Sequence, residues 1–223
     1  MSTSSMENAQ MIFGTLAEVA RSLANPHRLM LLEHIAQGER PVERLAELSQ
    51  LSLANASQHL QQLKRAGLVQ ARRDGKNVLY RLGDGPVQSL LAALHQYVAF
   101  RHGEISQFVS ESVNRQADLE SVSRGELLQR LSEGDVTLLD VRPSEEYRLG
   151  HLPGAINIPA EELEDRLAEL THQQEVIAYC RGPWCVLSQE AMTLLKRKGY
   201  RARCLEDGFP QWKAAGLHVE ASE

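Results

Sequence analysis

Cysteine is scarce in this 223-residue chain, and long apolar runs are missing. The three cysteines, Cys180, Cys185 and Cys204, argue against a disulfide scaffold and for thiol chemistry or core packing. No stretch approaches the roughly 18 apolar residues of a transmembrane helix. Residues 1–10 also lack the basic-then-apolar order of a signal peptide. We therefore expect a disordered lead over residues 1–11 and a cytoplasmic protein that makes no membrane contact.

An overall excess of positive charge is also absent, because the net charge is −5. Residues 1–120 hold equal numbers of basic and acidic residues, so the acidic excess lies in residues 121–223. Within residues 64–81, six basic residues stand against one acid, Asp74. Such a stripe can bind nucleic-acid phosphates or can simply be a solvated surface.

The first part of the chain is patterned as helices. Apolar residues recur at helical spacing over residues 13–23. Asn25-Pro26 is typical of an N-cap followed by proline at the first helical position. Further helices are predicted after Pro41 and over residues 52–66.

A hairpin and a long helix follow. Two β-prone segments, residues 68–73 and 76–82, flank Asp74-Gly75, which is a strong hairpin signal. Helices followed by a hairpin are the order of a winged helix-turn-helix domain. The helix predicted over residues 87–113 is more apolar than one small domain needs. It either packs on its own domain or forms a dimer seam with the first helix. We favour the seam, and hence a homodimer, because paired recognition helices reach successive major grooves.

The second part alternates strands and helices, which implies a parallel sheet covered on both faces. Strands are predicted over residues 136–141, 176–180 and 200–205. Helices are predicted over residues 127–131, 163–170, 187–198 and 211–215.

The length and the ordinary composition, 43% hydrophobic and 24% charged, suit two small domains. We predict an α+β winged helix-turn-helix domain for DNA binding and dimerisation over residues 12–113. A polar linker over residues 114–122 should connect it to an α/β domain with a parallel sheet over residues 123–220.

Several runs in the first domain carry a family resemblance. They are Asn25-Pro26-His27-Arg28, Leu45-Ala46-Glu47, the run from Asn55 to Val69, and the run from Arg72 to Leu82. Together they resemble the ArsR/SmtB family of bacterial repressors over about residues 12–110. The resemblance implies a regulator whose fourth helix enters the major groove of a double-stranded DNA operator.

The residue types in this region fit that role. Asn and Gln pair with adenine through two hydrogen bonds, Ser is permissive, and basic side chains suit phosphates or the minor groove. Any one of them, His59 for example, could instead be an ordinary exposed polar residue. The predicted DNA-binding residues are Ser52, Asn55, Ser57, Gln58, His59, Lys64, Arg65, Arg72, Arg73 and Lys76.

The metal sites of this family are not matched. Many members bind metal through a cysteine pair in the third helix or through His, Asp and Glu in the last helix. Here the third helix has no cysteine, and His95, His102 and Glu104 do not have the family spacing. We therefore expect no metal and no cofactor, and we place these histidines at the surface or in the dimer seam.

Four runs in the second domain carry another resemblance. They are Asp140-Val141-Arg142, Glu145-Glu146-Tyr147, the run from Gly150 to Pro159, and Glu206-Asp207-Gly208-Phe209. They resemble a single rhodanese domain over about residues 121–220. Asp140 and Arg142 are expected to support its site.

The loop that follows the strand at residues 176–180 is the candidate active-site loop, Cys180-Arg181-Gly182-Pro183-Trp184-Cys185. In the rhodanese family such a loop directs backbone N–H groups at the sulfur. Together with the next helix N-terminus, these groups would stabilise a thiolate or a persulfide, and Arg181 adds positive charge. Phosphatases of this fold have Arg where Val186 stands. The resemblance therefore favours a Cys180 persulfide, with thiosulfate, a persulfide or a polysulfide as the small sulfur donor.

The other two cysteines have separate expectations. Cys185 would resolve a persulfide into a disulfide or polysulfide bridge, or it would only pack the loop. Cys204 stands on a predicted strand and is expected in the core.

We predict a DNA-binding transcriptional regulator, by resemblance a repressor, whose rhodanese-like domain handles or senses reactive sulfur through Cys180. One alternative is a sulfurtransferase enzyme whose winged helix mainly localises it. The other is a regulator whose rhodanese fold passively binds an oxyanion. Whether thiosulfate or persulfide is turned over stays open.

Overall fold

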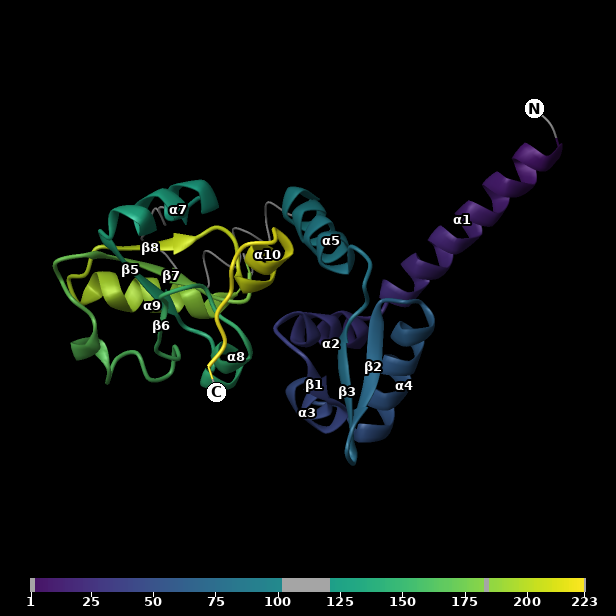
Figure 1. Ribbon diagram of the computed structural model, residues 1–223, viewed down its shortest axis with the longest axis horizontal. Helices are drawn as coiled ribbons and strands as arrows, with labels where there is room; N and C mark the ends of the chain where they lie inside the picture. Colours follow the sequence, from purple (N-terminus) through teal and green to yellow (C-terminus); the bar gives the residue numbers. More distant parts are fainter. Residues whose placement is uncertain (1–2, 102–120, 183–184, 223) are drawn as a thin grey trace. The chain divides into compact units, whose positions relative to one another are not determined.

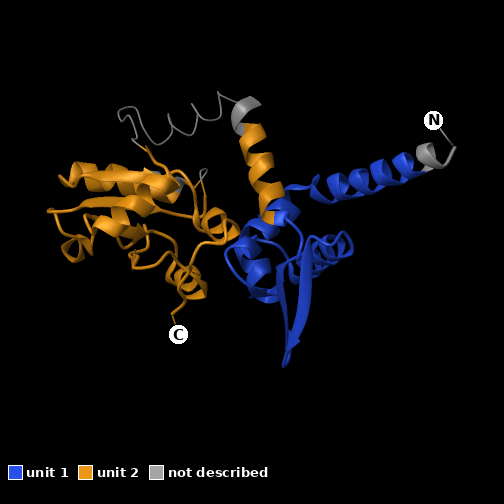
Figure 2. Cartoon of the chain, turned by 45° about the horizontal axis from the view of Figure 1, so that its top comes forward, with its two compact units in different colours: residues 1–87 blue, residues 88–223 orange. Residues whose placement is uncertain are grey.

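The computed structural model describes residues 3–101, 121–182 and 185–222. The chain divides into two compact units, residues 1–87 and 88–223 (Figure 2). Across the described residues, the helices are too short or too polar to cross a bilayer.

The first unit combines four helices with a small sheet (Figure 1). Its elements are α1 (Thr3–Leu23), α2 (Pro26–Ala36), β1 (Arg40–Pro41), α3 (Val42–Leu48), α4 (Leu53–Arg65), β2 (Val69–Asp74) and β3 (Asn77–Leu82).

Side-chain caps set where two of these helices begin. The Asn25 side chain accepts a hydrogen bond from the Arg28 N–H at 3.2 Å, and the proline at position 26 opens α2. Ser52 caps α4 in the same way, accepting from the Asn55 N–H at 3.3 Å. The apolar faces of α2, α3 and α4 meet in a core that includes the fully buried Leu31, Leu32, Leu45, Leu60 and Leu63.

The predicted hairpin is present. β2 and β3 pair antiparallel, with Asp74 opposite Asn77, so the turn consists of Gly75 and Lys76. Gly75 has a φ of 58°, a conformation that costs glycine little. β1 also pairs with β3, a contact that the sequence pattern did not predict.

α1 is longer than predicted. It begins at Thr3, so the described part of the expected disordered lead, residues 3–11, is helical. This segment contains no Gly or Pro, and it includes the helix-favouring residues Met6, Glu7, Ala9 and Gln10.

The second unit contains a five-stranded sheet with helices on both faces. After α5 (Val87–Arg101), which starts at the unit boundary, its described elements are β4 (Ser121–Val122), α7 (Arg124–Glu133), β5 (Val136–Asp140), α8 (Ser144–Leu149), β6 (Ile156–Asn157), η1 (Leu167–Glu169), β7 (Glu175–Tyr179), α9 (Val186–Arg197), β8 (Ala202–Leu205) and α10 (Phe209–Ala214).

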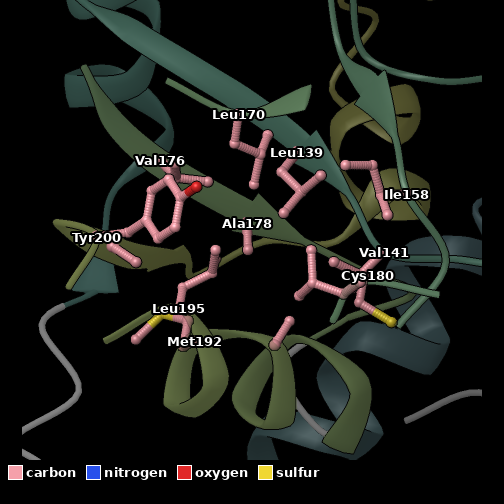
Figure 3. Packing of buried hydrophobic residues seen from close by; sticks show 13 residues of the cluster. Leu139, Val141, Ile158, Leu170, Val176, Ala178, Cys180, Met192, Leu195 and Tyr200 are labelled. Carbon is pink, nitrogen blue, oxygen red and sulfur yellow. The ribbon is translucent and has the colours of Figure 1, made fainter. Parts of the chain in front are cut away.

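The sheet is parallel throughout, in the order β4-β8-β7-β5-β6. Alternate residues of β5, β7 and β8 enter two separate cores. One core holds Leu139 and Ala178 against α9, and the other holds Leu138 and Ile177 against α7 and α10. Figure 3 shows the first core, with Cys180 beside Val141 at its edge.

The prediction of a parallel sheet is confirmed, but three strands were predicted and five are described. β4 and β6 are two residues long, too short for a periodic pattern. The helix predicted over residues 163–170 is instead a series of turns over residues 163–166 followed by the short 3₁₀ helix η1.

The predicted domain boundary falls largely outside the described residues. The helix predicted over residues 87–113 is described as α5 up to Arg101. Of the predicted linker, residues 114–122, only the last two are described, and they form β4.

Leu139 should be essential to the stability of the second unit. Its side chain is 0% exposed in the first core, so Leu139→Ala removes buried methyl groups and leaves a cavity. We expect a loss of about 2–5 kcal/mol in the free energy of unfolding. Urea unfolding followed by tryptophan fluorescence reports on this unit, because both tryptophans belong to it.

Leu149→Ala is the matched control, because Leu149 is 42% exposed. It should change the free energy of unfolding by no more than about 0.5 kcal/mol. Equal losses in the two variants would contradict this description of the core.

Candidate functional site

One face of α4 presents polar side chains to solvent. Asn55 and Gln58 are exposed, whereas Ala56, Leu60 and Leu63 are buried on the opposite side. Ser52, also predicted to contact bases, uses its hydroxyl as the cap of α4. The amides of Asn55 and Gln58 are therefore the predicted base-reading groups best placed to meet a groove.

Ser57 and His59 are partly buried. The His59 ring lies 5.6 Å from the His27 ring on α2, centroid to centroid. Partial burial, followed by the nearby Arg28 and His27, lowers the pKa of His59. His59 therefore lies at the edge of the polar face of α4, with its ring near α2. Its role in reading bases stays a prediction.

The predicted phosphate-binding side chains fall into two groups. Lys64 and Arg65 are exposed in the last turn of α4, and Arg73 and Lys76 are exposed on the hairpin. Within the described part of the chain, these four cations form no ion pair with an acidic side chain.

Arg72 is different, because Glu39 binds it. The Arg72 guanidinium donates to both Glu39 carboxylate oxygens, at 2.6 and 3.0 Å. These hydrogen bonds raise the pKa of Arg72 above its ordinary value. The sequence did not reveal this pair, because the two residues are 33 positions apart.

The candidate sulfur site lies at the carboxyl end of β7. Cys180 and Cys185 form a disulfide, with their Cα atoms 6.3 Å apart. Cys180 is 2% exposed at the edge of the first core, while Cys185 is partly exposed and is the N-cap residue of α9. The other predicted loop residues include Gly182, which is described, and Pro183 and Trp184, which lie outside the described residues.

Arg181 does not add an unbalanced positive charge to this loop. Its guanidinium donates to Glu146 at 2.7 Å, and the Glu146 carboxylate is 2% exposed. The prediction of added charge was wrong because Glu146, from α8, neutralises it. Glu146 stands in the Glu145-Glu146-Tyr147 run that carried the family resemblance, which is the one signal that could have drawn attention to it.

Asp140 and Arg142, the predicted support residues, form a buried ion pair just at the end of β5. Both side chains are fully buried, and Arg142 donates to Asp140 at 2.6 Å and to the Gly150 carbonyl at 2.7 Å. The guanidinium lies 4.3 Å from the centroid of the Phe209 ring. The Asn157 side chain donates to the backbone carbonyls of both Asp140 and Arg142.

The start of α10 packs directly on the cysteine loop. The Phe209 N–H donates to the Cys180 carbonyl at 3.0 Å. A Cβ built on Gly208 would overlap the Gly182 nitrogen and would lie 2.5 Å from the Arg181 carbonyl oxygen. Gly208 is thus a site residue that the sequence reasoning passed over, although it stands in the Glu206-Asp207-Gly208-Phe209 run.

Cys204 lies on β8, packs against the first core and is a free thiol. Burial raises its pKa, as expected of a core cysteine. Of the possible metal ligands in the last helix of the first domain, His102 and Glu104 lie outside the described residues.

Both parts of the chain match known domain families. Residues 23–70 match the model of a helix-turn-helix domain, and residues 123–215 match that of a rhodanese-like domain. The chain thus joins a DNA-binding module of the winged-helix class to a rhodanese fold.

Relatives match the whole chain or one part of it. The chain is 45% identical over 206 residues to the HTH-type transcriptional regulator Rv0324 of Mycobacterium tuberculosis, covering 92% of this chain and 90% of that one. A sulfurtransferase of Allochromatium vinosum is 33% identical over 99 residues, covering 44% and 91%. The solution structure of a homodimeric winged helix-turn-helix domain from Mycobacterium bovis is 40% identical, covering 47% and 92%, with a TM-score of 0.41.

The chain belongs to the family of helix-turn-helix transcriptional regulators in which an ArsR-type winged helix precedes a rhodanese-like domain. It is a DNA-binding regulator.

Glu39 should weaken DNA binding by occupying Arg72. In Glu39→Gln the guanidinium loses its closer charged partner and keeps only the Asp74 carboxylate at 3.9 Å, so it becomes more available to a phosphate. We expect binding to a promoter fragment to tighten about five- to tenfold at low salt, with a salt dependence steeper by about one counterion for each protomer bound. Fluorescence anisotropy at several salt concentrations measures both quantities.

The same substitution in an Arg72→Gln background is the control, and there it should have little effect. An equal gain in both backgrounds would show that Glu39 acts by long-range repulsion and not through Arg72.

Gly208→Ala should disturb the cysteine loop, because the added methyl group overlaps its backbone. We expect reduced protein to re-form the Cys180–Cys185 bond several-fold more slowly in a glutathione buffer, measured by counting free thiols. Gly125→Ala is the control, because its Cβ meets open space at the start of α7. Wild-type rates in both variants would refute the close packing at Gly208.

Proposed function

We propose that this regulator responds to reactive sulfur through Cys180 and Cys185, and that it acts as a repressor. The observation that carries the proposal is the proximity of the two cysteines, which are joined by a disulfide at the end of β7. A regulator that responds to a signal needs two states that bind DNA differently. A pair of cysteines that switches between dithiol and disulfide supplies two covalent states.

The proposed chemistry starts from the dithiol. The Cys180 thiolate attacks the terminal sulfur of a hydropersulfide donor, forming a Cys180 persulfide and breaking the donor S–S bond, and the donor leaves as a thiolate. The Cys185 thiolate then attacks Cys180 Sγ and displaces HS⁻, which forms the disulfide. The two cysteines lose two electrons, the sulfane sulfur gains them, and the protons of both thiols pass to the departing thiolate and HS⁻.

The surroundings of the loop support this division of roles. Cys180 is buried against apolar side chains, which favours a small donor such as a hydropersulfide or inorganic polysulfide. Cys185 stands at the N-cap of α9, where the helix dipole favours anionic sulfur. It is therefore suited to act as the resolving thiolate.

For DNA binding, we propose that the exposed face of α4 enters the major groove and that the hairpin contacts the backbone. The polar residues near the start of α4 would meet bases, and the basic side chains at the end of α4 and on the hairpin would meet phosphates. The proposed contacts are Ser52, Asn55, Ser57, Gln58, His59, Lys64, Arg65, Arg72, Arg73 and Lys76.

We also propose a homodimer. Apolar side chains are exposed on α1, where four of them are 57–69% accessible, and further ones are exposed on α5. Contiguous exposed apolar surface is typical of an interface. These residues are Met11, Ile12, Phe13 and Leu16 on α1, and Leu94, Tyr97 and Val98 on α5.

A second candidate function is catalytic sulfur transfer. It is favoured by the similarity of the second unit to a sulfurtransferase. In that case the persulfide would pass to an external acceptor, and Cys180→Ser would abolish turnover of thiosulfate or a persulfide donor.

The proposal is tested by DNA binding before and after polysulfide treatment. Reduced wild type should bind a fragment of its own promoter region, and treatment should change the affinity by about tenfold or more. Cys180→Ser should bind without responding. Cys185→Ser should gain the mass of one sulfur atom on Cys180, because nothing resolves the persulfide, whereas wild type should end as the disulfide.

Unchanged affinity in treated wild type, with the disulfide confirmed by mass spectrometry, would sink the sensing role. Thiosulfate turnover that depends on Cys180 would then put the sulfurtransferase first.

A further inference from the structure

A basic cleft of about 360 Å³ lies within the first unit, between α1, α2 and α4. Its wall contains Arg21 from α1, Arg28 from α2, and Gln62 and Arg65 from α4. Glu18 is the one acid among the described residues that line it. Three guanidinium groups and an amide therefore face a single carboxylate, so the cleft favours an anion.

Arg28 builds the cleft and holds it in shape. Its Nε and one terminal nitrogen donate to the carbonyls of Ser22 and Arg21, at 2.6 and 2.8 Å, in the last turn of α1. Its other terminal nitrogen donates to Gln62 Oε1 at 2.7 Å. These bonds satisfy carbonyls that the end of α1 leaves without partners, and they tie α1 to α4.

Arg21 and Arg65 keep donors for a ligand. Both side chains are exposed. Among the described residues, the Arg21 side chain makes one hydrogen bond, from its Nε to the Ala17 carbonyl at 3.3 Å. Within the part of the chain that the structure describes, Arg65 makes no hydrogen bond or ion pair through its side chain. The terminal nitrogens of two guanidinium groups, one from α1 and one from α4, are thus available at the cleft.

The cleft borders the polar face of α4. Gln58 and Arg65 are seven residues apart, which is close to two helical turns, so they point from the same side of the helix. A duplex that meets Gln58 would bring a backbone strand near the end of α4. Phosphate oxygens match guanidinium groups in charge and geometry.

We propose that this cleft binds a phosphate of the DNA backbone through Arg21 and Arg65, which makes α1 a DNA-contacting helix. The inference rests on the DNA-binding mode proposed above. It adds a phosphate contact at the C-terminal end of α4, whereas the proposed base-reading residues lie toward the N-terminal end. The ligand is a phosphate monoanion held by two guanidinium groups. A free phosphate ion offers the cleft the same chemistry as a phosphate of the DNA backbone.

The test is the salt dependence of binding to a generic 30-base-pair duplex. Each lost phosphate contact should lower the slope of log affinity against log salt by about 0.9. Arg21→Gln should show this loss once for each protomer of the proposed homodimer, together with an affinity about five- to tenfold lower near 0.1 M salt. Arg21→Lys should keep the slope, and Glu18→Gln should bind more tightly.

Arg148→Gln is the matched control, because it removes an exposed arginine from the second unit, and it should match wild type. Circular dichroism should show that every variant is folded. An Arg73→Gln/Lys76→Gln variant tests the proposed DNA-binding mode independently of the cleft.

A wild-type slope for Arg21→Gln beside a reduced slope for Arg73→Gln/Lys76→Gln would overturn the cleft contact and leave the DNA-binding mode intact. Unchanged slopes in both variants would overturn the DNA-binding mode itself. Arg21-dependent binding of inorganic phosphate, measured by calorimetry, together with a wild-type DNA slope would assign the cleft to a free anion instead.

Discussion

The buried ion pair between Asp140 and Arg142 fixes the carboxyl edge of the sheet, and the sulfur site depends on that edge. From the end of β5, Arg142 reaches the Gly150 carbonyl and the ring of Phe209. Phe209 in turn donates its N–H to the Cys180 carbonyl. A buried pair of this kind is costly to desolvate and contributes little net stability when it is complete. What it contributes here is position, because the Arg142 guanidinium lies against Phe209, and the Phe209 N–H in turn bonds to the cysteine loop.

Much of the architecture could be predicted, because local patterns determine it. The Asp74-Gly75 signal gave the hairpin, although the turn itself is one residue further along, at Gly75 and Lys76. The apolar runs gave β5 and β7. The shortest strands, β4 and β6, could not be predicted. They are strands because they pair with β8 and β5, and their own residues show no strand pattern.

The electrostatics of both sites were the least predictable feature. Glu146 neutralises Arg181 from 35 positions away, and Glu39 occupies Arg72 from 33 positions away. A sequence shows how many charges a segment carries, but not which acid folds against which base. The consequence differs between the sites. On the hairpin, Arg73 and Lys76 keep their charge available. At the cysteine loop the charge of Arg181 is balanced, so the anionic sulfur of the proposed cycle would be stabilised by peptide dipoles and the start of α9.

The unequal exposure of the two bonded sulfurs gives the disulfide a direction. Cys180 is enclosed by the first core, while Cys185 lies in the outer part of the loop. An incoming thiolate from a cellular reductase therefore meets Cys185 first, and the transient mixed disulfide forms on that residue. Cys180 is the leaving group of this exchange and is released as a free thiolate. In the proposed cycle, reduction would thus restore Cys180, the proposed nucleophile, one step before Cys185 is released from its mixed disulfide.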